Sequence, residues 1–322
     1  MNAADPPAIR VDGLTRVFGR GVKSVSALDG VSLEVSYGEV VALLGMNGAG
    51  KTTLIKILST LLLPTSGSAV VAGHDIVREP RHAREATSVV FGGDRGLYLR
   101  LTGLDNLRFF GMLAGLGRRE LKGRIDSALE RVNLTSVAGK RVETYSRGMR
   151  QRLHLAVGLL ASPKVLLLDE PTVGLDPVES DRLRDVVLTM RDSGVAILLT
   201  SHYLLDVEKL ATRVLLLSSG RIRENMTIAE FVRESGDAAT VTIRGHGIPP
   251  DIAAGRLPGT VTVTCRQQGS DAWAVDLRLR EWNGDVFKLL DDLFVTVKVD
   301  DVQVRETRLE EAFAAIFAQL TP

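Results

Sequence analysis

This sequence has very little cysteine and almost no net charge. One of its 322 residues is a cysteine, Cys265, which excludes an intramolecular disulfide framework and favours a reducing compartment. The 40 basic and 39 acidic residues give a net charge of +1. Because nucleic-acid binding needs a concentrated basic surface, we expect no nucleic-acid partner.

Long apolar runs are also absent. The longest stretch without Asp, Glu, Lys or Arg lies between Lys56 and Asp75, and Pro64 and Gly67 interrupt it. A helix that spans a bilayer needs about 20 mostly apolar residues, so we expect no membrane span here. The overall composition, 45% hydrophobic and 25% charged, is typical of a folded globular protein.

The charge balance changes near residue 222 and indicates two domains. Residues 1–222 hold 29 Lys and Arg against 23 Asp and Glu, whereas residues 223–322 hold 11 against 16. The chain is also longer than a typical single domain of about 100–150 residues. We therefore predict one domain over 1–222 and a smaller one over 223–322.

The first domain alternates short apolar runs with helical patterns. The runs VVALLG (40–45), VLLLD (165–169) and AILLT (196–200) show no polar alternation. Such runs are typical of parallel strands that are buried on both faces, with helices between them. The pattern predicts an α/β fold.

The second domain shows strands of a different kind. Apolar and polar residues alternate in 240–245, 260–265, 272–279 and 294–299, as in half-exposed strands. A last helix is predicted from Thr307, where Glu310 completes a capping box. We thus predict a small α+β domain. One face of that helix either packs on the domain core or contacts a partner, and it consists of Leu309, Phe313, Ile316, Phe317 and Leu320.

A phosphate-binding loop follows the first apolar run. The segment GMNGAGKT, residues 45–52, matches G-x-x-x-x-G-K-[ST] between a predicted strand and a predicted helix. Its glycines let backbone N–H groups face phosphate oxygens, Lys51 reaches the β- and γ-phosphates, and Thr52 coordinates Mg²⁺. This context disfavours an ordinary glycine-rich turn. The predicted nucleotide-binding residues are Gly45, Asn47, Gly48, Ala49, Gly50, Lys51, Thr52 and Thr53.

Two carboxylates end the apolar run at 165–169. Ligands of open α/β sheets bind at the carboxyl ends of the strands, where Asp169 and Glu170 follow one another. Alone, such residues are often solvated acids. Together with the phosphate loop, they predict that Asp169 holds Mg²⁺ and that Glu170 orients or deprotonates the water that attacks the γ-phosphate, with Lys51 also catalytic.

The run YSRGMRQR, residues 145–152, resembles the signature motif of ATP-binding-cassette (ABC) proteins. In that family two cassettes form a head-to-tail dimer, and the signature of one covers the ATP of the other. The resemblance implies that Ser146 and the Gly148 N–H donate to the γ-phosphate. The alternative is a capped surface helix with a basic first turn.

Three further positions extend the resemblance. Phe18, in RVFG ahead of the first sheet strands, resembles the aromatic residue that stacks on adenine, although a core phenylalanine is the alternative. Asp176 resembles the D-loop aspartate that acts across the dimer interface. His202, after a predicted strand, resembles the switch histidine that contacts the γ-phosphate.

One family residue is missing. A glutamine normally follows the strand that is predicted here at 87–91, where it assists Mg²⁺ binding and senses the membrane partner. This sequence has Gly93 at that position and Asp94 one residue later. The sequence therefore leaves open which residue takes the role of the glutamine.

The resemblance implies an ABC-type P-loop nucleotide-binding domain over 1–222, with a RecA-like core, an antiparallel β part and a helical subdomain at about 97–155. Residues 97–144 would hold a groove for a helix of a separate membrane permease. The C-terminal part, with Leu309–Phe313 reading LEEAF, is similar to type-2 exporter ATPases of the daunorubicin-resistance and multidrug group.

The implied protein is the ATP- and Mg²⁺-dependent ATPase subunit of an exporter, dimeric, cytoplasmic and peripheral on the inner face of the cell membrane. The domain at 223–322 would serve dimerisation or regulation. The alternative is a soluble ABC ATPase without a transport role, either a cofactor-assembly scaffold or a regulatory nucleotide-binding subunit.

Overall fold

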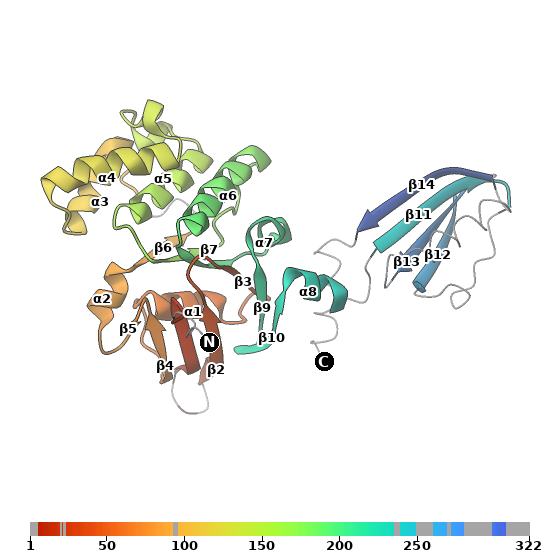
Figure 1. Ribbon diagram of the computed structural model, residues 1–322, viewed down its shortest axis with the longest axis horizontal. Coiled ribbons are helices and arrows are strands. Elements are labelled where there is room, and N and C mark those ends of the chain that lie inside the picture. Colours follow the sequence, from red (N-terminus) through yellow and green to blue (C-terminus); the bar gives the residue numbers. More distant parts are fainter. Residues whose placement is uncertain are drawn as a thin grey trace, which may run out of the picture. The chain divides into compact units, whose positions relative to one another are not determined.

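The structure is a computed structural model, and it describes residues 6–19, 21, 24–92, 96–234, 239–248, 260–268, 272–279 and 298–306. The chain forms two compact units, Met1–Met226 and Thr227–Pro322 (Figure 1). Each unit has its own sheets and its own hydrophobic core. The functional residues predicted above all belong to the first unit.

A six-stranded sheet forms the centre of the first unit, in the order β10-β9-β3-β8-β7-β6. Strands β3, β7 and β8 are buried at every residue, and each pair among neighbouring β9, β3, β8, β7 and β6 is parallel. The predicted buried parallel strands are confirmed. The bounds are β3 (Val40–Leu44), β6 (Thr87–Phe91), β7 (Val165–Asp169), β8 (Ala196–Thr200), β9 (Arg213–Ser218) and β10 (Arg221–Thr227).

Alternate residues of these strands enter two different cores, which explains why the runs are continuously apolar. Leu166 and Leu168 of β7 belong to the core that includes the helical part of the unit. Val165 and Leu167 belong to the core shared with the antiparallel sheet and α1. The helices outside the helical part are α1 (Lys51–Leu58), α2 (Pro80–Glu85), α6 (Pro177–Asp192) and α7 (Leu204–Leu210).

The antiparallel β part is a four-stranded sheet in the order β2-β1-β4-β5. Phe18 is the last residue of β1, where it pairs with Val25, so its predicted place ahead of the first strands is wrong. The polar residues within β1 hide this strand in the sequence. The strand bounds are β1 (Ile9–Phe18), β2 (Val25–Val35), β4 (Ser66–Val71) and β5 (His74–Asp75).

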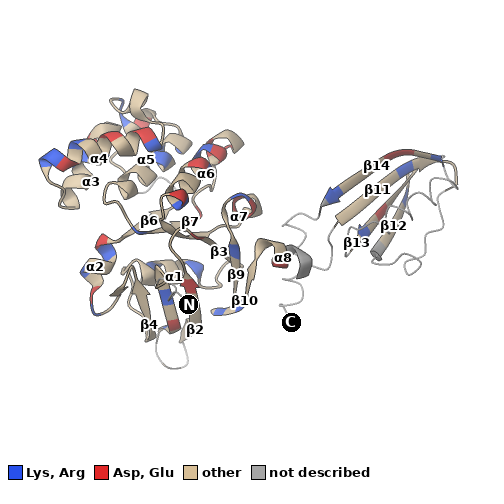
Figure 2. Cartoon of the chain, in the orientation of Figure 1, with Lys and Arg blue, Asp and Glu red and all other residues tan. Residues whose placement is uncertain are grey.

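The helical part lies between β6 and β7 in the chain. Thr102 caps the first of its helices by accepting a hydrogen bond from the N–H of Asp105, and Ser146 caps the last. Charges of both signs lie on α4 and on α6 (Figure 2). The elements are α3 (Gly103–Leu113), α4 (Arg118–Arg131), η2 (Thr135–Val137), η3 (Val142–Thr144) and α5 (Arg147–Leu159).

The second unit contains a four-stranded antiparallel sheet in the order β12-β13-β11-β14. One face is apolar, with Trp273, Val275 and Leu277 buried, and this confirms the alternating pattern. The described elements are α8 (Ile228–Glu234), β11 (Ala239–His246), β12 (Thr260–Gln268), β13 (Ala272–Leu279) and β14 (Lys298–Glu306).

The last strand extends further than predicted. Of the predicted range 294–299, residues 298 and 299 belong to β14, which continues to Glu306, and residues 294–297 lie outside the described residues. Two acidic residues conceal the alternation of β14. Asp301 pairs with Arg244 and Asp300 with His246 across the strand pair. The predicted helix from Thr307, with its apolar face, lies outside the described residues.

In the part of the chain that the structure describes, no helix is long and apolar enough to cross a membrane.

Candidate functional site

The phosphate loop joins β3 to α1 and depends on glycine at several positions. Gly48 and Gly50 have φ angles of 84° and 113°, a left-handed region that favours glycine. A Cβ atom at Gly45 would collide with the backbone oxygen of Leu217. The sequence spacing thus corresponds to a tightly curled loop before a helix N-terminus, the arrangement that binds phosphate in P-loop proteins.

Lys51 lies at the first position of α1 and reaches back across the loop. Its Nζ donates to the backbone oxygens of Gly45 at 2.6 Å and Met46 at 3.2 Å. Burial lowers the pKa of Lys51, and the charges of Glu170 and Asp169 oppose that shift. The ammonium is therefore held within the loop, close to the two carboxylates that end β7.

Asp169 joins the phosphate loop to the strand beside it. Its Oδ2 accepts a hydrogen bond from Thr52 Oγ1 at 3.0 Å, and its Oδ1 accepts one from Thr200 Oγ1 at 2.6 Å. Asp169 is 8% exposed, so a buried carboxylate and a hydroxyl lie side by side. Hard oxygen donors of this kind fit Mg²⁺, which keeps several waters and takes few protein ligands.

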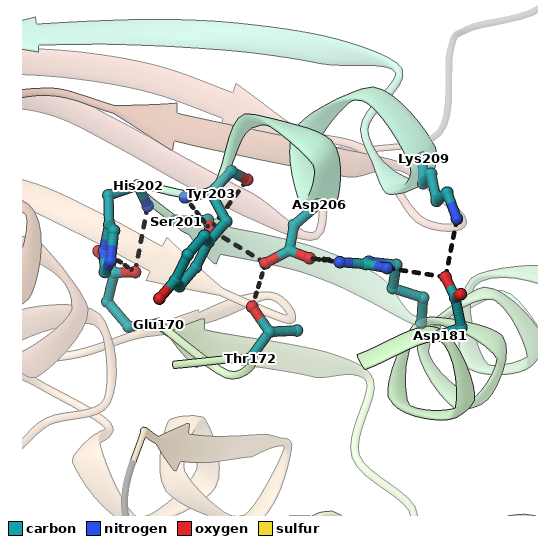
Figure 3. Close-up of polar contacts among 9 residues, drawn as sticks. Glu170, Thr172, Asp181, Ser201, His202, Tyr203, Asp206 and Lys209 are labelled. Carbon is teal, nitrogen blue, oxygen red and sulfur yellow. Dashed lines mark hydrogen bonds and ion pairs between the residues drawn. The ribbon is translucent and has the colours of Figure 1, made fainter. Parts of the chain in front are cut away.

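Glu170 is held in an unusual backbone conformation. Its φ angle is 55°, which is rare for a residue with a side chain and occurs mostly where surrounding contacts impose it. Its N–H donates to the backbone oxygen of Thr200 at 3.0 Å, and its Oε2 accepts from the N–H of His202 at 3.1 Å. The same oxygen lies 2.7 Å from Nδ1 of His202 (Figure 3).

Behind this pair, Asp206 of α7 is completely buried and accepts hydrogen bonds from several elements (Figure 3). Its donors are Thr172, Ser201 and Arg184. Sequence reasoning missed Asp206 and Thr200. A threonine that ends an apolar strand and an acid within a short helix give no signal that they are buried.

The signature residues lie at the start of α5. Ser146 accepts a hydrogen bond from the N–H of Met149 at 3.1 Å and so caps the helix. Gly148 packs so closely on Glu179 that a Cβ atom would collide with it. Arg152, 4% exposed, lies 3.0 Å from Oε2 of Glu179, which joins α5 to α6. The recorded contacts of Ser146 and Gly148 are with these helices rather than with the phosphate loop.

Asp176 and Gly174 lie between β7 and α6. Asp176 is the N-cap of α6, and its Oδ1 accepts from the N–H of Glu179 at 2.9 Å. Gly174 has a φ angle of 70° and lies against the guanidinium of Arg147, where a Cβ atom would collide. The segment that carries Asp176 thus lies next to the start of the signature helix.

Phe18 is 40% exposed at the end of β1, so it is not a core residue. The guanidinium carbon of Arg16 lies 4.5 Å from the centre of its ring. An exposed ring with a cation against it can stack on a planar ligand.

A cleft of about 1350 Å³ extends from the carboxyl end of β7 along α2, β6, α3 and α5. Thr52, Asp169 and Glu170 line one end of it. Apolar side chains line much of the rest, together with the basic residues Lys56, Arg81, Arg84 and Arg147 and the polar residues Glu85, Thr87, Ser88 and His154. Gly93, predicted at the position of the missing glutamine, and Asp94, one residue later, lie outside the described residues.

The structure therefore brings together Lys51, Thr52, Asp169, Glu170 and His202 at the carboxyl ends of the parallel strands. Phe18, Ser146, Gly148 and Asp176 lie on other elements of the same unit. Gly45, Asn47, Gly48, Ala49, Gly50 and Thr53 belong to the phosphate loop and the start of α1.

Comparison with known proteins identifies the family. A family model described as ABC transporter matches residues 28–173. The chain is 39% identical over 308 residues to the daunorubicin resistance ATP-binding protein DrrA3 of Streptomyces coeruleorubidus, which covers 95% of this chain and 94% of the relative. It is 42% identical over 233 residues to the doxorubicin resistance ATP-binding protein DrrA of Mycobacterium tuberculosis, over 72% of this chain and 70% of the relative.

Solved structures agree. The chain is similar to cbiO1 of Clostridium perfringens, described as part of the ABC transporter complex cbiONQ, with a TM-score of 0.64 and 27% identity, over 72% of this chain and 95% of that one. The predicted ABC-type fold is confirmed.

The chain belongs to the ABC transporter family and to its group of drug-exporter ATP-binding proteins. It is the ATP-binding, ATP-hydrolysing subunit of an exporter. The comparisons do not favour the alternative of an ABC ATPase without a transport role.

Proposed function

We propose that the chain hydrolyses ATP with Mg²⁺ by means of the residues at the ends of β3, β7 and β8. Lys51 and the loop N–H groups bind the β- and γ-phosphates, and Thr52 and Asp169 hold the metal ion, which neutralises phosphate charge. Glu170 is the general base for the attacking water, and His202 orients Glu170 and contacts the γ-phosphate. The 2.7 Å contact between Glu170 and His202 supports this assignment most directly.

The second half of each site comes from another copy of the chain. Ser146 caps α5 through its oxygen, which leaves its hydroxyl proton for a further acceptor, and the helix N-terminus favours an anion. Asp176 lies at the next helix start. In a head-to-tail homodimer, these groups complete the site of the partner, and Phe18 stacks on the adenine of the copy to which it belongs.

The 1350 Å³ cleft receives a cytoplasmic segment of a separate membrane permease. The apolar side chains of its lining fit one face of an amphipathic helix. Leu113 of α3, 72% exposed, belongs to this lining, and its neighbour Met112 is 59% exposed. This docking places the protein on the inner face of the cell membrane. ATP-driven dimer closure then moves the helical part and, with it, the permease.

Two relatives are named for resistance to daunorubicin and doxorubicin. On that basis the exported substrate is a drug-like organic molecule, whose choice depends on the permease. The second unit, at 223–322, assists dimerisation or regulation.

The test is purification of the protein from gently solubilised membranes, followed by mass spectrometry and by transport in vesicles. A stoichiometric polytopic partner and ATP-dependent export of a drug-like molecule are expected. A protein that stays free of membranes, or that accompanies a cofactor-assembly complex, would refute the export proposal but not the ATPase assignment.

A further inference from the structure

Asp206 connects the two loops that carry Glu170 and His202. Its Oδ2 accepts from Thr172, two residues after Glu170, and from Ser201 at 3.1 Å, one residue before His202. Ser201 also accepts from the N–H of Tyr203 at 3.0 Å, which fixes the turn around His202. One buried oxygen atom thus joins both loops (Figure 3).

The charge of Asp206 is balanced inside the protein rather than by water. Arg184 of α6 donates to its Oδ1 from Nε at 2.7 Å and from Nη2 at 2.6 Å. Arg184 in turn contacts Asp181 at 2.8 Å, and Lys209 contacts the same oxygen of Asp181 at 2.7 Å. Hydrogen bonds from Lys209 and Arg184 lower the pKa of Asp181. The two acids and two bases form a chain from the buried carboxylate to the surface.

A buried ion pair seldom stabilises a fold more than apolar side chains of the same volume would, because both charges lose their hydration. The chain of charges therefore calls for another explanation. A carboxylate can accept hydrogen bonds from two hydroxyl groups at one oxygen and from a guanidinium at the other. An amide has only one acceptor oxygen and an apolar residue has none, so neither can accept all of these hydrogen bonds.

We propose that Asp206 is a positioning residue for ATP hydrolysis, which holds the Glu170 loop and the His202 loop at the separation that their contact requires. This inference rests on the proposed roles of Glu170 and His202. On this proposal, the hydrogen bonds that Thr172 and Ser201 donate to Asp206 hold the two loops together, and Arg184 balances the charge of Asp206.

The test compares Asp206→Asn with Asp181→Asn in the full chain. Both changes remove one negative charge from the same chain of ion pairs, but Asp181 touches neither loop. We expect Asp206→Asn to lower kcat at least tenfold while the Kd for ATP changes less than threefold, and Asp181→Asn to stay within twofold of wild type in both. Wild-type kcat in a folded, ATP-binding Asp206→Asn variant would overturn the proposal.

Thr172→Val and Ser201→Ala keep the test decisive if Asp206→Asn does not fold. Each change removes one hydrogen bond to Asp206, so each should lower kcat. The fold reduction of kcat in the double variant should be smaller than the product of the two single reductions. Independent, multiplicative effects would overturn the proposal. Glu170→Gln, measured alongside, separates the positioning role of Asp206 from the catalytic role of Glu170. Wild-type turnover by Glu170→Gln would refute the catalytic role of Glu170 itself.

A second feature lies away from this site, between β5 and α2. His74, Glu79 and His82 place three potential metal-ligating atoms within 4.8 Å of one another, and their side chains are 37%, 47% and 61% exposed. Oε1 of Glu79 lies 3.5 Å from Nδ1 of His74 and 4.0 Å from Nδ1 of His82. The two rings stack with centroids 5.2 Å apart.

Both separations are long for hydrogen bonds. The 3.5 Å separation is close to the distance between two ligands of one zinc ion, and the 4.0 Å separation is somewhat longer. Two bonds of about 2.0–2.1 Å at a tetrahedral angle leave the ligand atoms about 3.4 Å apart. The backbone is already fixed, because Asp75 Oδ1 accepts from the N–H groups of Val77 and Arg78 at 2.8 Å. Small side-chain rotations would bring the three donors onto one ion.

From this geometry we infer that His74, Glu79 and His82 bind a divalent cation of the zinc class, with water at the remaining position. Two imidazoles and a carboxylate are a ligand set that zinc uses in proteins. The same helix, α2, carries Arg81 and Arg84 into the cleft wall. A bound ion would tie this wall to the antiparallel sheet.

Zinc titration of the metal-free full chain by calorimetry, without nucleotide, tests the site. We expect one ion per chain, and at least a tenfold weaker Kd in His74→Gln and in His82→Gln. His246→Gln is the matched control, since His246 also pairs with an acid, Asp300. Absence of binding, or equal weakening by the control, would overturn the inference.

Discussion

Nδ1 of His202 lies 2.7 Å from Oε2 of Glu170, and the backbone N–H of His202 donates to the same oxygen at 3.1 Å. Two nitrogen atoms of His202 thus contact the carboxylate that follows β7. Because β7 and β8 are parallel neighbours, their carboxyl ends bring these loops together. The contact therefore follows from the sheet topology. It predicts that Glu170 and His202 act together in hydrolysis rather than independently.

Replacing Lys51 with alanine should weaken ATP binding. A hydrogen bond to a charged group contributes about 1.5–3 kcal/mol, which corresponds to roughly 10- to 100-fold in affinity. Equilibrium binding of a fluorescent ATP analogue measures this. Lys56→Ala serves as the control, because Lys56 lies on the same helix but outside the phosphate loop. Unchanged affinity in Lys51→Ala would refute the phosphate-loop assignment.

Thr200→Val should slow hydrolysis more than it weakens ATP binding. The hydroxyl donates to Asp169 at 2.6 Å and lies 3.2 Å from the N–H of Glu170, so its loss leaves a buried carboxylate oxygen without a donor. An unsatisfied buried group costs about 1–3 kcal/mol, and we expect a fall in kcat of about tenfold. Steady-state ATPase assays with Thr200→Ser as control measure it. Equal rates in the valine and serine variants would contradict the prediction.

Leu113→Asp should reduce retention of the membrane partner. Leu113 lines the cleft and is 72% exposed, so a charge there opposes docking of an apolar helix face without disturbing the core. Quantitative co-purification measures the partner-to-ATPase ratio. Leu61→Asp is the control, since Leu61 is 61% exposed and does not line the cleft. If both variants retain the partner like the wild type, the cleft is not the docking site.

Removal of residues 227–322 should leave ATP binding intact and weaken dimer formation. The first unit has its own hydrophobic cores and contains the whole phosphate loop. Analytical ultracentrifugation with ATP compares the shortened and the full chain, and ATP affinity shows that the shortened chain is folded. Equally strong dimerisation would assign the second unit another role.

Much of the fold and of the phosphate site could be predicted from sequence. The strands β7 and β8 are continuously apolar and end at a polar residue, so pattern alone gives their bounds. The phosphate loop was predictable because its glycines, Lys51 and Thr52 have fixed spacing. These features depend on local sequence.

Features that depend on tertiary pairing were not predictable. The polar residues of β1 obscured the strand that ends at Phe18, and Asp300 and Asp301 obscured β14, because their partners lie on other strands. Asp206 lies in the sequence LLDVEKL, where an acid normally faces solvent. Its burial follows from Arg184, 22 positions away in the chain, which no local pattern reveals.

The most direct test of the account is the mass of Glu170→Gln in solution with and without ATP and Mg²⁺, measured by light scattering after size exclusion. Loss of the general base should slow hydrolysis by about 10²- to 10⁴-fold and trap an ATP-bound dimer, so the mass should double with ATP. A second change, Ser146→Arg, should prevent this doubling while the Kd for ATP stays the same. Wild-type turnover by Glu170→Gln, or an ATP-dependent dimer that is indifferent to Ser146→Arg, would contradict the account.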